Sequence, residues 1–342
     1  MNLQNLLNIE FPIIQAPMAG VQGSAMAIAV SNAGGLGSLP CAMLDTNELR
    51  SELQTVKAGT SHPFNLNFFA HTSPEPNEQQ ELAWREALAP YYDELGIDTS
   101  AITAGAGRKP FDSEAATFVE EFRPAVVSFH FGLPELTLLQ RVKAAGAKVL
   151  STATTVEEAL WLQQHGADAV IAQGLEAGGH RGHFLSKDLS RQMGTFALVP
   201  QMVAALDIPV IAAGGIADSP GVQAAIRLGA AGVQLGTAFL LCHEANTKPV
   251  HRDALKYRSQ HTALTNLFTG GAARGIVNRV IQELGPISES APEFPMASTA
   301  IAPLRAAAEA KNSGDFSPLW AGQNTSGCQE VAASELLRQL VI

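Results

Sequence analysis

A glycine-rich loop carries the residue of this sequence best suited to proton transfer. His180 lies in the run QGLEAGGHRG, from Gln173 to Gly182, directly after a double glycine. A neutral imidazole titrates near working pH, so it can accept a proton from an acidic carbon. Glycine neighbours allow such a loop to hold the ring over a flat bound molecule. We therefore expect His180 to be a catalytic base, and the alternative is a hydrogen-bonding loop histidine.

Glycines that follow two apolar runs indicate an anion site. Gly214 and Gly215 come directly after Pro209 to Ala213, and Gly236 precedes Thr237 after another such run. Backbone N–H groups at glycines can close on a phosphate, and a following helix N-terminus adds favourable dipole charge. The pattern predicts a ligand that carries a phosphate, whereas tight turns alone would also use glycines.

Two amide side chains stand where they could contact a flat heteroaromatic ring. Asn67 lies within the third expected strand and Gln173 ends the sixth, and an amide can both donate to and accept from the carbonyls and ring nitrogens of a flavin. Combined with the phosphate site, this favours FMN as the cofactor. Taken alone, each amide is equally compatible with an ordinary capping role.

Two further histidines require an interpretation. His130, in the run Ser128 to Gly132, could orient an anionic substrate, although a core histidine is an equally good interpretation. His180 and His183 have an HxxH spacing, but no third Asp, Glu, His or Cys ligand stands nearby in the sequence. We therefore expect no metal site.

The residues above must be positioned by a repeated architecture. Eight short apolar runs alternate with helical segments, which is typical of βα units with a parallel sheet buried on both faces. The expected strands are Pro12 to Pro17, Leu36 to Leu39, Asn65 to Phe69, Ala125 to Phe131, Lys148 to Thr152, Ala169 to Gln173, Pro209 to Ala213 and Gly232 to Gly236. This pattern predicts a (β/α)8 TIM barrel over residues 1–243, with a doubly wound open sheet as the alternative.

Two regions interrupt the alternation. Residues 72–112 form an insertion after the third expected strand. Residues 244–342 show helical patterns separated by Gly-Gly, Gly-Pro and Pro-Glu-Phe-Pro turns, so we expect a small helical lid or substrate domain over the barrel mouth.

Composition limits the classes of partner. The 342 residues have a formal net charge of −10, and no Lys/Arg run indicates binding to nucleic acid or an anionic membrane. The first basic residue is Arg50, no long apolar stretch occurs, and Cys41, Cys242 and Cys328 form no CxxC pair. We expect a cytoplasmic monomer or homodimer that binds small molecules.

Several motifs together resemble the nitronate monooxygenases, formerly called 2-nitropropane dioxygenases, and in particular their first class. The resemblance lies in Gln15 to Gly20, Asn65 to Phe69, Val127 to Pro134, Gly174 to Gly182, Ala212 to Ile216, Gln234 to Thr237 and Leu319 to Gln323. It implies an FMN-binding barrel with His180 as the base. The cofactor would be bound by Met18, Asn67, Gln173, Gly178, Gly179, Gly214, Gly215, Gln234, Leu235, Gly236 and Thr237.

The resemblance also implies an activity. Such a flavoprotein oxidoreductase would oxidise alkyl nitronates, for example propionate 3-nitronate, with O2 to a carbonyl compound and nitrite through a flavin semiquinone, a form of nitroalkane detoxification. Aromatic residues often line the substrate side in this family, where this chain offers Met296 and Ala300.

Two other functions remain open. The GLEAGGH segment also resembles FMN-dependent enoyl-acyl-carrier-protein reductases and flavin NADH:quinone reductases, so an NAD(P)H-dependent flavin reductase is the alternative enzyme. A flavin-binding regulatory subunit without turnover is the alternative that is not an enzyme.

Overall fold

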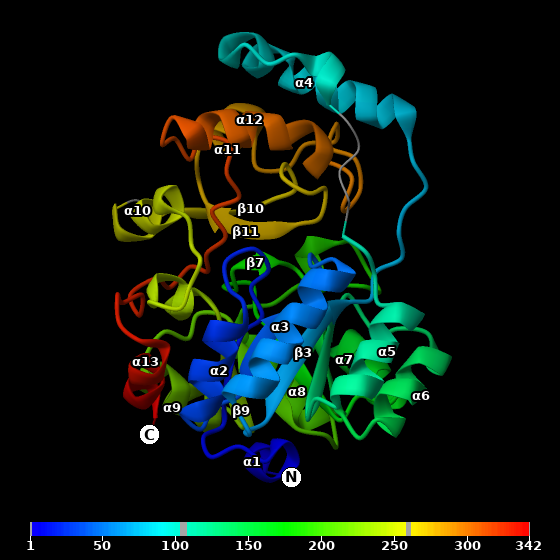
Figure 1. Cartoon of the computed structure of the whole chain (residues 1–342), viewed down its shortest axis with the longest axis vertical. Helices are drawn as coiled ribbons and strands as arrows, with labels where there is room; N and C mark the ends of the chain where they lie inside the picture. The colour runs from blue at the N-terminus through cyan, green and yellow to red at the C-terminus, as the bar shows by residue number, and fades with distance from the viewer. Residues whose placement is uncertain (1, 103–107, 258–260, 342) are drawn as a thin grey trace.

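The computed structural model describes residues 2–102, 108–257 and 261–341. Its lower part is a barrel of eight parallel strands (Figure 1). These are β1 (Ile13–Gln15), β2 (Gly37–Pro40), β3 (Phe64–Phe69), β4 (Val126–His130), β5 (Lys148–Ala153), β6 (Ala169–Gln173), β8 (Val210–Ala213) and β9 (Gly232–Leu235). Each lies within two residues of an expected strand, because continuous apolar runs are what a doubly covered parallel strand requires.

The sheet closes on itself. Its strand order is β1-β9-β8-β6-β5-β4-β3-β2, and a parallel bridge between Ile14 and Leu36 joins the two ends. Across this junction, Gln15 N donates to Leu36 O at 3.0 Å and Leu36 N donates to Ile13 O at 2.9 Å. The prediction of a TIM barrel is therefore confirmed, and the open sheet is wrong.

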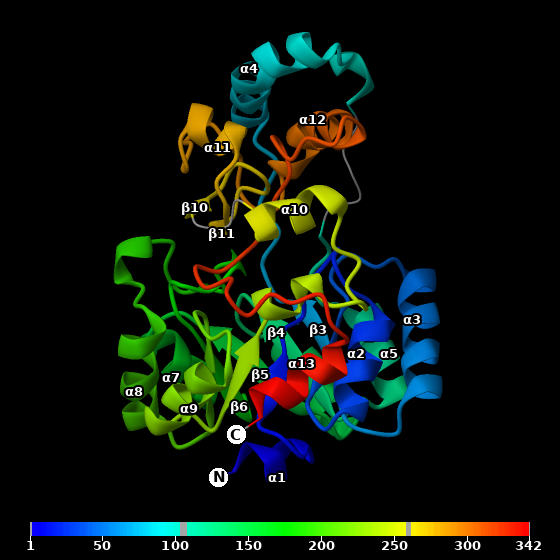
Figure 2. The same cartoon turned by 90° about the vertical axis from the view of Figure 1, so that its left-hand side faces the viewer.

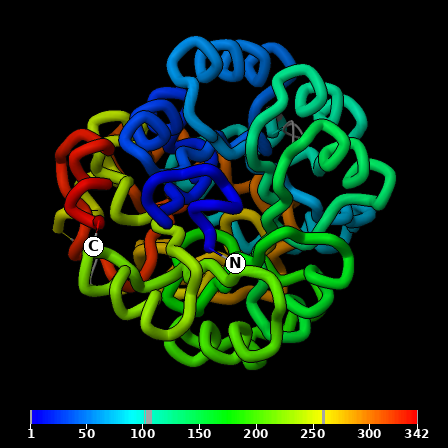
Figure 3. The backbone as a smooth tube through the Cα atoms, turned by 90° about the horizontal axis from the view of Figure 1, so that it is seen from below, coloured from blue at the N-terminus to red at the C-terminus, as the bar shows by residue number. Residues whose placement is uncertain are grey.

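Helices surround the barrel, as the view from below shows (Figure 3). They begin at the side-chain caps that the sequence provides: Thr155 accepts from Glu158 N at the start of α7, and Asp45 and Glu48 form a capping box on α3. The helices of this layer are α2 (Ser24–Asn32), α3 (Thr46–Gly59), α5 (Ser113–Phe122), α6 (Leu136–Ala144), α7 (Val156–Gln164), α8 (Thr195–Ala205) and α9 (Ser219–Arg227).

The bottom of the barrel is covered by α1 (Leu3–Leu7). Leu3 and Leu7 are buried against Ile14, Leu150 and Ile211 of the barrel strands. This apolar contact leaves the carboxyl ends of the strands, at the opposite end of the barrel, as the open face (Figure 1).

A lid built from two distant segments covers that face (Figure 2). The insertion supplies α4 (Glu78–Leu95) and a short turn, η1 (Thr99–Ala101), and residues 103–107 lie outside the described ranges. α4 packs on α12 (Ser298–Ala310), where Trp84 Nε1 donates to Ala297 O at 3.1 Å and Tyr92 Oη donates to Ala300 O at 2.7 Å. The insertion and the C-terminal segment therefore form one unit.

The C-terminal segment was expected to be helical, and the structure differs in two respects. Besides α10 (Pro249–Tyr257) and α11 (Arg279–Leu284), it contains the antiparallel strands β10 (Thr262–Thr265) and β11 (Ala273–Ile276). β11 also pairs with β7 (Gly179–His180), so the hairpin holds the glycine-rich loop. The last helix, α13 (Ala333–Leu340), leaves the lid and packs on α2 and α9 of the barrel. Strands of four residues carry too little alternation to be predicted from sequence.

Two short 3-10 helices, η2 (Leu189–Arg191) and η3 (Thr237–Leu241), complete the elements around the barrel mouth. A search of the described residues finds no helix with the length and apolar character that a membrane crossing needs.

Candidate active site

A cavity of about 250 Å³ lies between the carboxyl ends of the barrel strands and the lid. Barrel loops and lid residues line it together, as expected for a TIM barrel, whose sites are built at this end. The residues that the sequence analysis assigned to catalysis, substrate orientation and cofactor binding all line this cavity: Met18, Asn67, His130, Gln173, Gly178, Gly179, His180, Gly214, Gly215, Gln234, Leu235, Gly236 and Thr237. Their roles remain predictions.

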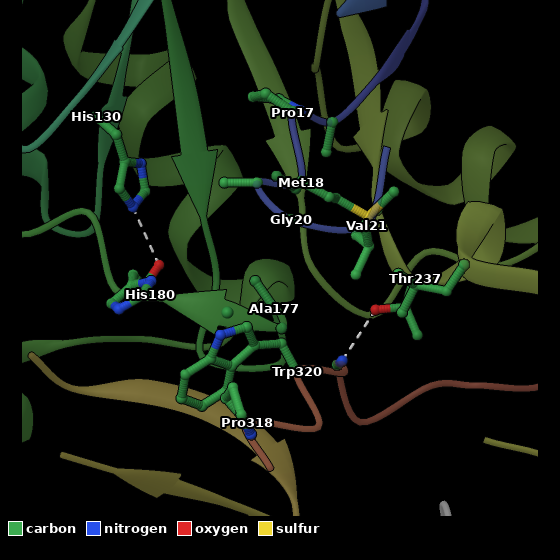
Figure 4. Close-up of a pocket in the computed structure, with 18 of the residues that line it drawn as sticks. Pro17, Met18, Gly20, Val21, His130, Ala177, His180, Thr237, Pro318 and Trp320 are labelled. Carbon is green, nitrogen blue, oxygen red and sulfur yellow. Dashed lines mark hydrogen bonds between the residues drawn. The ribbon is translucent and has the colours of Figure 1, made fainter. Parts of the chain in front are cut away.

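His180 is held through both its ring and its backbone. Its Nε2 forms a hydrogen bond of 2.9 Å with Thr269 Oγ1, from the loop between β10 and β11. Its carbonyl oxygen accepts from Gln173 Nε2 at 2.8 Å and from His130 Nε2 at 3.1 Å (Figure 4). No hydrogen bond to Nδ1 of His180 is found among the described residues, so this nitrogen is the one available to a bound molecule.

The environment of His180 keeps its ring neutral. Burial lowers the pKa of His180 well below the ordinary 6.5, and the positive charge of Arg108 lowers it further. A neutral ring with a free nitrogen can accept a proton. The geometry therefore agrees with the proposed base, because the protonation state needed for that role is the one the cavity favours at neutral pH.

His130 contacts the loop of His180. Because a carbonyl oxygen only accepts, the contact with His180 O places a proton on His130 Nε2. Burial lowers the pKa of His130 to about 4, so its Nδ1 is an unprotonated acceptor for the hydroxyl of Thr152 at 3.1 Å. Both ring nitrogens are thus engaged within the protein. Direct contact of His130 with a substrate stays a prediction, whereas its contact with the loop is observed.

Buried arginines, which the sequence analysis did not assign, fix the same loop. Arg181 donates from Nη2 to Gln173 O at 2.7 Å and from Nη1 to Gly174 O at 2.8 Å. Arg274 of β11 donates from Nε to Leu175 O at 2.8 Å. Burial lowers the pKa of Arg181 to about 9. The position of Arg181 next to His180 in the HRG motif was the available signal.

The cavity contains features that fit bound FMN. Gly214 and Gly215 adopt φ values of 115° and 75°, and a Cβ on Gly236 would lie 3.5 Å from Met18 Sδ. Gln234 Oε1 is buried and accepts no hydrogen bond from the described residues. A buried acceptor without a partner is costly unless a ligand supplies the donor, and a flavin ring has an N–H group. These residues therefore fit FMN.

The two amides of the expected ring contact differ in availability. Asn67 Nδ2 donates to Ser128 Oγ at 2.9 Å, and no hydrogen bond to its Oδ1 is found among the described residues. Gln173 uses both ends of its amide in the loop, because its Oε1 accepts from Gly182 N at 2.8 Å. In this structure the amide of Gln173 is therefore bonded to the glycine-rich loop at both ends.

Aromatic rings surround the imidazole ring of His180. The ring centroids of Phe294 and Trp320 lie 5.2 and 5.5 Å from that of His180, and those of Phe131 and Phe69 lie 6.3 and 6.4 Å away.

Met296 and Ala300, which the sequence offers on the substrate side, do not line this cavity. Ala300 is buried beneath α4, and Met296 lines a separate surface pocket formed with the insertion. The reason is that the face of α12 that carries Ala300 packs against α4.

Comparison with known proteins decides the family. The family model described as nitronate monooxygenase matches residues 1–342 of this chain. The chain belongs to the nitronate monooxygenase family. It is therefore an oxidoreductase, and the resemblance inferred from its motifs is confirmed.

The similarity of this family member to its relatives covers nearly the whole length of the chain. It is 42% identical over 339 residues to a nitronate monooxygenase of Pseudomonas aeruginosa, covering 98% of this chain and 97% of the relative. It is 40% identical to a nitronate monooxygenase of Paraburkholderia phytofirmans, with 98% and 92% covered.

Two solved structures superpose on nearly the whole chain. A nitroalkane oxidase from Streptomyces ansochromogenes superposes with a TM-score of 0.89 at 36% identity, covering 99% of this chain and 96% of that one. FabK from Thermotoga maritima superposes with a TM-score of 0.72 at 27% identity, covering 99% and 94%.

Proposed function

We propose that this family member is an FMN-dependent enzyme that oxidises alkyl nitronates, and nitroalkanes after deprotonation, with O2 to a carbonyl compound and nitrite. The observation that carries the proposal is His180, which is half-buried, neutral and open at Nδ1 inside a cavity lined by glycine loops. A base of this kind suits removal of a proton from a carbon next to a nitro group.

The cofactor is proposed on the fit of the cavity. The loops of Gly214, Gly215 and Gly236 would hold the phosphate, and Gln234 and Asn67 would meet the ring. When bound, FMN supplies the electron acceptor for oxidation of the nitronate. The protein's own part is to position the substrate, to move one proton and to exclude water.

His180 would remove the α-proton of a neutral nitroalkane through Nδ1. In the tautomer that this step requires, Nε2 carries a proton, and Nε2–H donates to the hydroxyl of Thr269. The product of this step is a nitronate anion, and the imidazolium and the nearby charge of Arg108 stabilise it. A substrate that arrives as the nitronate needs no such proton transfer.

Aromatic walls exclude solvent from this step. Phe69, Phe294 and Trp320 surround the imidazole ring, and the lid lies above the barrel mouth. A desolvated pocket strengthens each electrostatic contact with the anion.

The direct test is oxygen uptake and nitrite release by the FMN-loaded protein after addition of propyl-1-nitronate or propionate 3-nitronate, without NADH. Consumption of O2 with release of nitrite would support the proposal. Absence of both, with the flavin bound, would refute it.

A second candidate is an NAD(P)H-dependent flavin reductase of quinones or enoyl thioesters, because the GLEAGGH segment, Gly174 to His180, also resembles such reductases. Its signature is rapid bleaching of the flavin absorbance by NADH under anaerobic conditions. Bleaching together with no response to nitronates would establish this alternative.

A further inference from the structure

Among the described residues, the imidazole of His180 has a single hydrogen-bond partner, and this partner comes from the lid. Thr269, in the loop between β10 and β11, is buried, and its Oγ1 lies 2.9 Å from Nε2 of His180. Thr269 is not one of the described residues that line the cavity, so it would act on a substrate only through the imidazole. The expected base is thus completed by a residue 89 positions further along the chain.

The loop that carries Thr269 is firmly held in the lid. The side chain of Asn266 donates from Nδ2 to Ser288 O at 2.8 Å, and its Oδ1 accepts from Ser288 N at 2.9 Å. Leu267 and Phe268 are buried in the apolar cluster that α4 and α12 share. The hydroxyl of Thr269 is therefore placed by the fold before any substrate binds, as a positioning group must be.

The same hairpin also holds the backbone of His180. The pairing of β11 with β7 sets Ala273 opposite His180, and Arg181 N donates to Ala272 O at 2.8 Å. One element thus contacts the backbone and the ring of the expected base. The distance between Nε2 and Oγ1 is consequently fixed by the pairing of two neighbouring strands.

The partner of the imidazole is neutral. The charges that act on His180 come from Arg108, His130 and His71, and no carboxylate acts on it in the described part of the chain. A carboxylate partner would raise the pKa of an imidazole, whereas a hydroxyl orients the ring without adding a charge. A neutral partner therefore suits a base that must stay unprotonated until the substrate arrives.

A hydroxyl can interact with Nε2 in two ways. It can accept from Nε2–H or donate to an unprotonated Nε2, and these arrangements correspond to opposite tautomers of the ring. Only the first leaves a lone pair on Nδ1, the nitrogen open to a bound molecule. After proton transfer both nitrogens carry protons, and the hydroxyl oxygen can still accept from Nε2–H. The first arrangement therefore serves the base before and after the step.

We propose that Thr269 is a positioning residue for the reaction: its hydroxyl oxygen accepts from Nε2–H of His180 and so keeps Nδ1 as the proton acceptor. This inference rests on the proposed function and deepens it. In the step concerned, the α-carbon–hydrogen bond of the nitroalkane breaks, its electron pair stays on the substrate as the nitronate, and the proton goes to Nδ1. Thr269 neither gains nor loses a proton.

The kinetic test compares nitroethane with ethyl nitronate, which needs no proton removal. For Thr269→Val we expect kcat/KM for nitroethane to fall by about tenfold and that for ethyl nitronate by less than about twofold. The isotope effect with nitroethane deuterated at its α-carbon should rise, because proton transfer becomes slower. Thr269→Ser restores the hydroxyl and should recover most of the loss.

Thr265→Val is the matched control. Thr265 is a buried threonine of the same hairpin, and its Oγ1 accepts from Leu267 N at 3.2 Å without contacting His180. This variant can weaken the hairpin, but the ratio of the two substrate rates should stay at the wild-type value. A similar change of the ratio in both variants would assign the effect to the stability of the hairpin and overturn the role of Thr269.

Heteronuclear NMR of the FMN-loaded, histidine-labelled protein determines the tautomer without turnover. The signals of His180 are assigned by their loss in His180→Asn. We expect the proton on Nε2 in the wild type and in Thr269→Ser, and a mixture of tautomers in Thr269→Val. A proton on Nδ1 in the wild type, an unchanged tautomer in Thr269→Val, or equal losses on the two substrates would overturn the proposal. Failure of the wild type to release nitrite from ethyl nitronate would instead overturn the proposed function.

Discussion

The Nε2–H of His130 donates to the backbone carbonyl oxygen of His180 at 3.1 Å. The contact joins the end of β4 to the glycine-rich loop, and the hydroxyl of Thr152 on β5 completes the chain of hydrogen bonds. A residue expected to touch the substrate thus also positions the expected base.

This relationship predicts the effect of removing His130. In His130→Phe the carbonyl of His180 loses one of its two donors, so the loop is less well fixed. We expect kcat/KM for a nitroalkane to fall by about tenfold, with FMN still bound. Steady-state oxygen uptake measures the change, and His62→Phe on the exposed surface is the control. An unaltered rate in His130→Phe would contradict a positioning role.

His180→Asn tests the base itself. An amide cannot accept the α-proton, so kcat/KM for a neutral nitroalkane should fall by about 100-fold or more. A preformed nitronate needs no proton removal, and its loss should be less than about tenfold. Parallel nitrite assays on the two substrates give the ratio. Equal losses would mean that His180 is not the base.

The lowered pKa of His180 predicts the pH dependence of nitroalkane turnover. The ring accepts a proton only when neutral, and burial keeps it neutral below the ordinary value of 6.5. We expect kcat/KM to stay level as the pH falls from about 8 through 6.5, and to drop only at lower pH. Initial rates over this range decide the point. An acidic limb centred at 6.5 or above would show that burial does not govern the group.

Two histidines with lowered pKa values also predict how stability depends on pH. Burial lowers the pKa of His130 and of His251 to about 4, while the unfolded chain titrates near 6.5. Between these values the unfolded state binds more protons, so the free energy of unfolding falls as pH falls.

Urea denaturation at pH 7 and pH 5 should show this loss. His251→Gln should weaken the dependence, because one titrating group is removed, and His62→Gln, at an exposed position, should not. Equal stability of the wild type at the two pH values would contradict the prediction.

Gly215→Ala tests the phosphate loop. Gly215 has φ of 75°, where an alanine costs about 1 kcal/mol, and the new Cβ would meet Glu176 Cβ at 3.4 Å. We expect the Kd for FMN to rise by at least about tenfold, because a displaced loop loses its N–H contacts. Fluorescence titration of the apoprotein measures it.

Gly146→Ala is the matched control for that variant. Gly146 has φ of 94°, a Cβ added to it would meet no other part of the chain within 4 Å, and it lies before β5, away from the cavity. It carries the backbone strain without the site. Equal weakening of FMN binding in both variants would assign the effect to stability.

The barrel could be predicted from local sequence patterns. Runs such as Ala169 to Ala172 are apolar throughout because both faces are covered, and Thr155 caps α7 through its own side chain. The glycines and His180 follow strands, so their place at the barrel mouth comes from the repeat itself.

The walls and supports of the site depend on contacts distant in sequence. Phe294 and Thr269 reach His180 from the lid, and Arg274 reaches Leu175 across 99 positions. No local pattern encodes such contacts, because they depend on how the lid docks. The same holds for Ala300, whose burial depends on α4.

The composite lid has a consequence for the modularity of the protein. Its halves, α4 and the C-terminal segment, are separated in the sequence by the barrel strands β4 to β9. The chain then returns to the barrel through α13. A truncation at residue 243 would therefore strip the cover from Trp84 and Tyr92 and remove α13 from α2 at the same time. The lid cannot be exchanged as a cassette, and any graft from a relative must transfer both segments together.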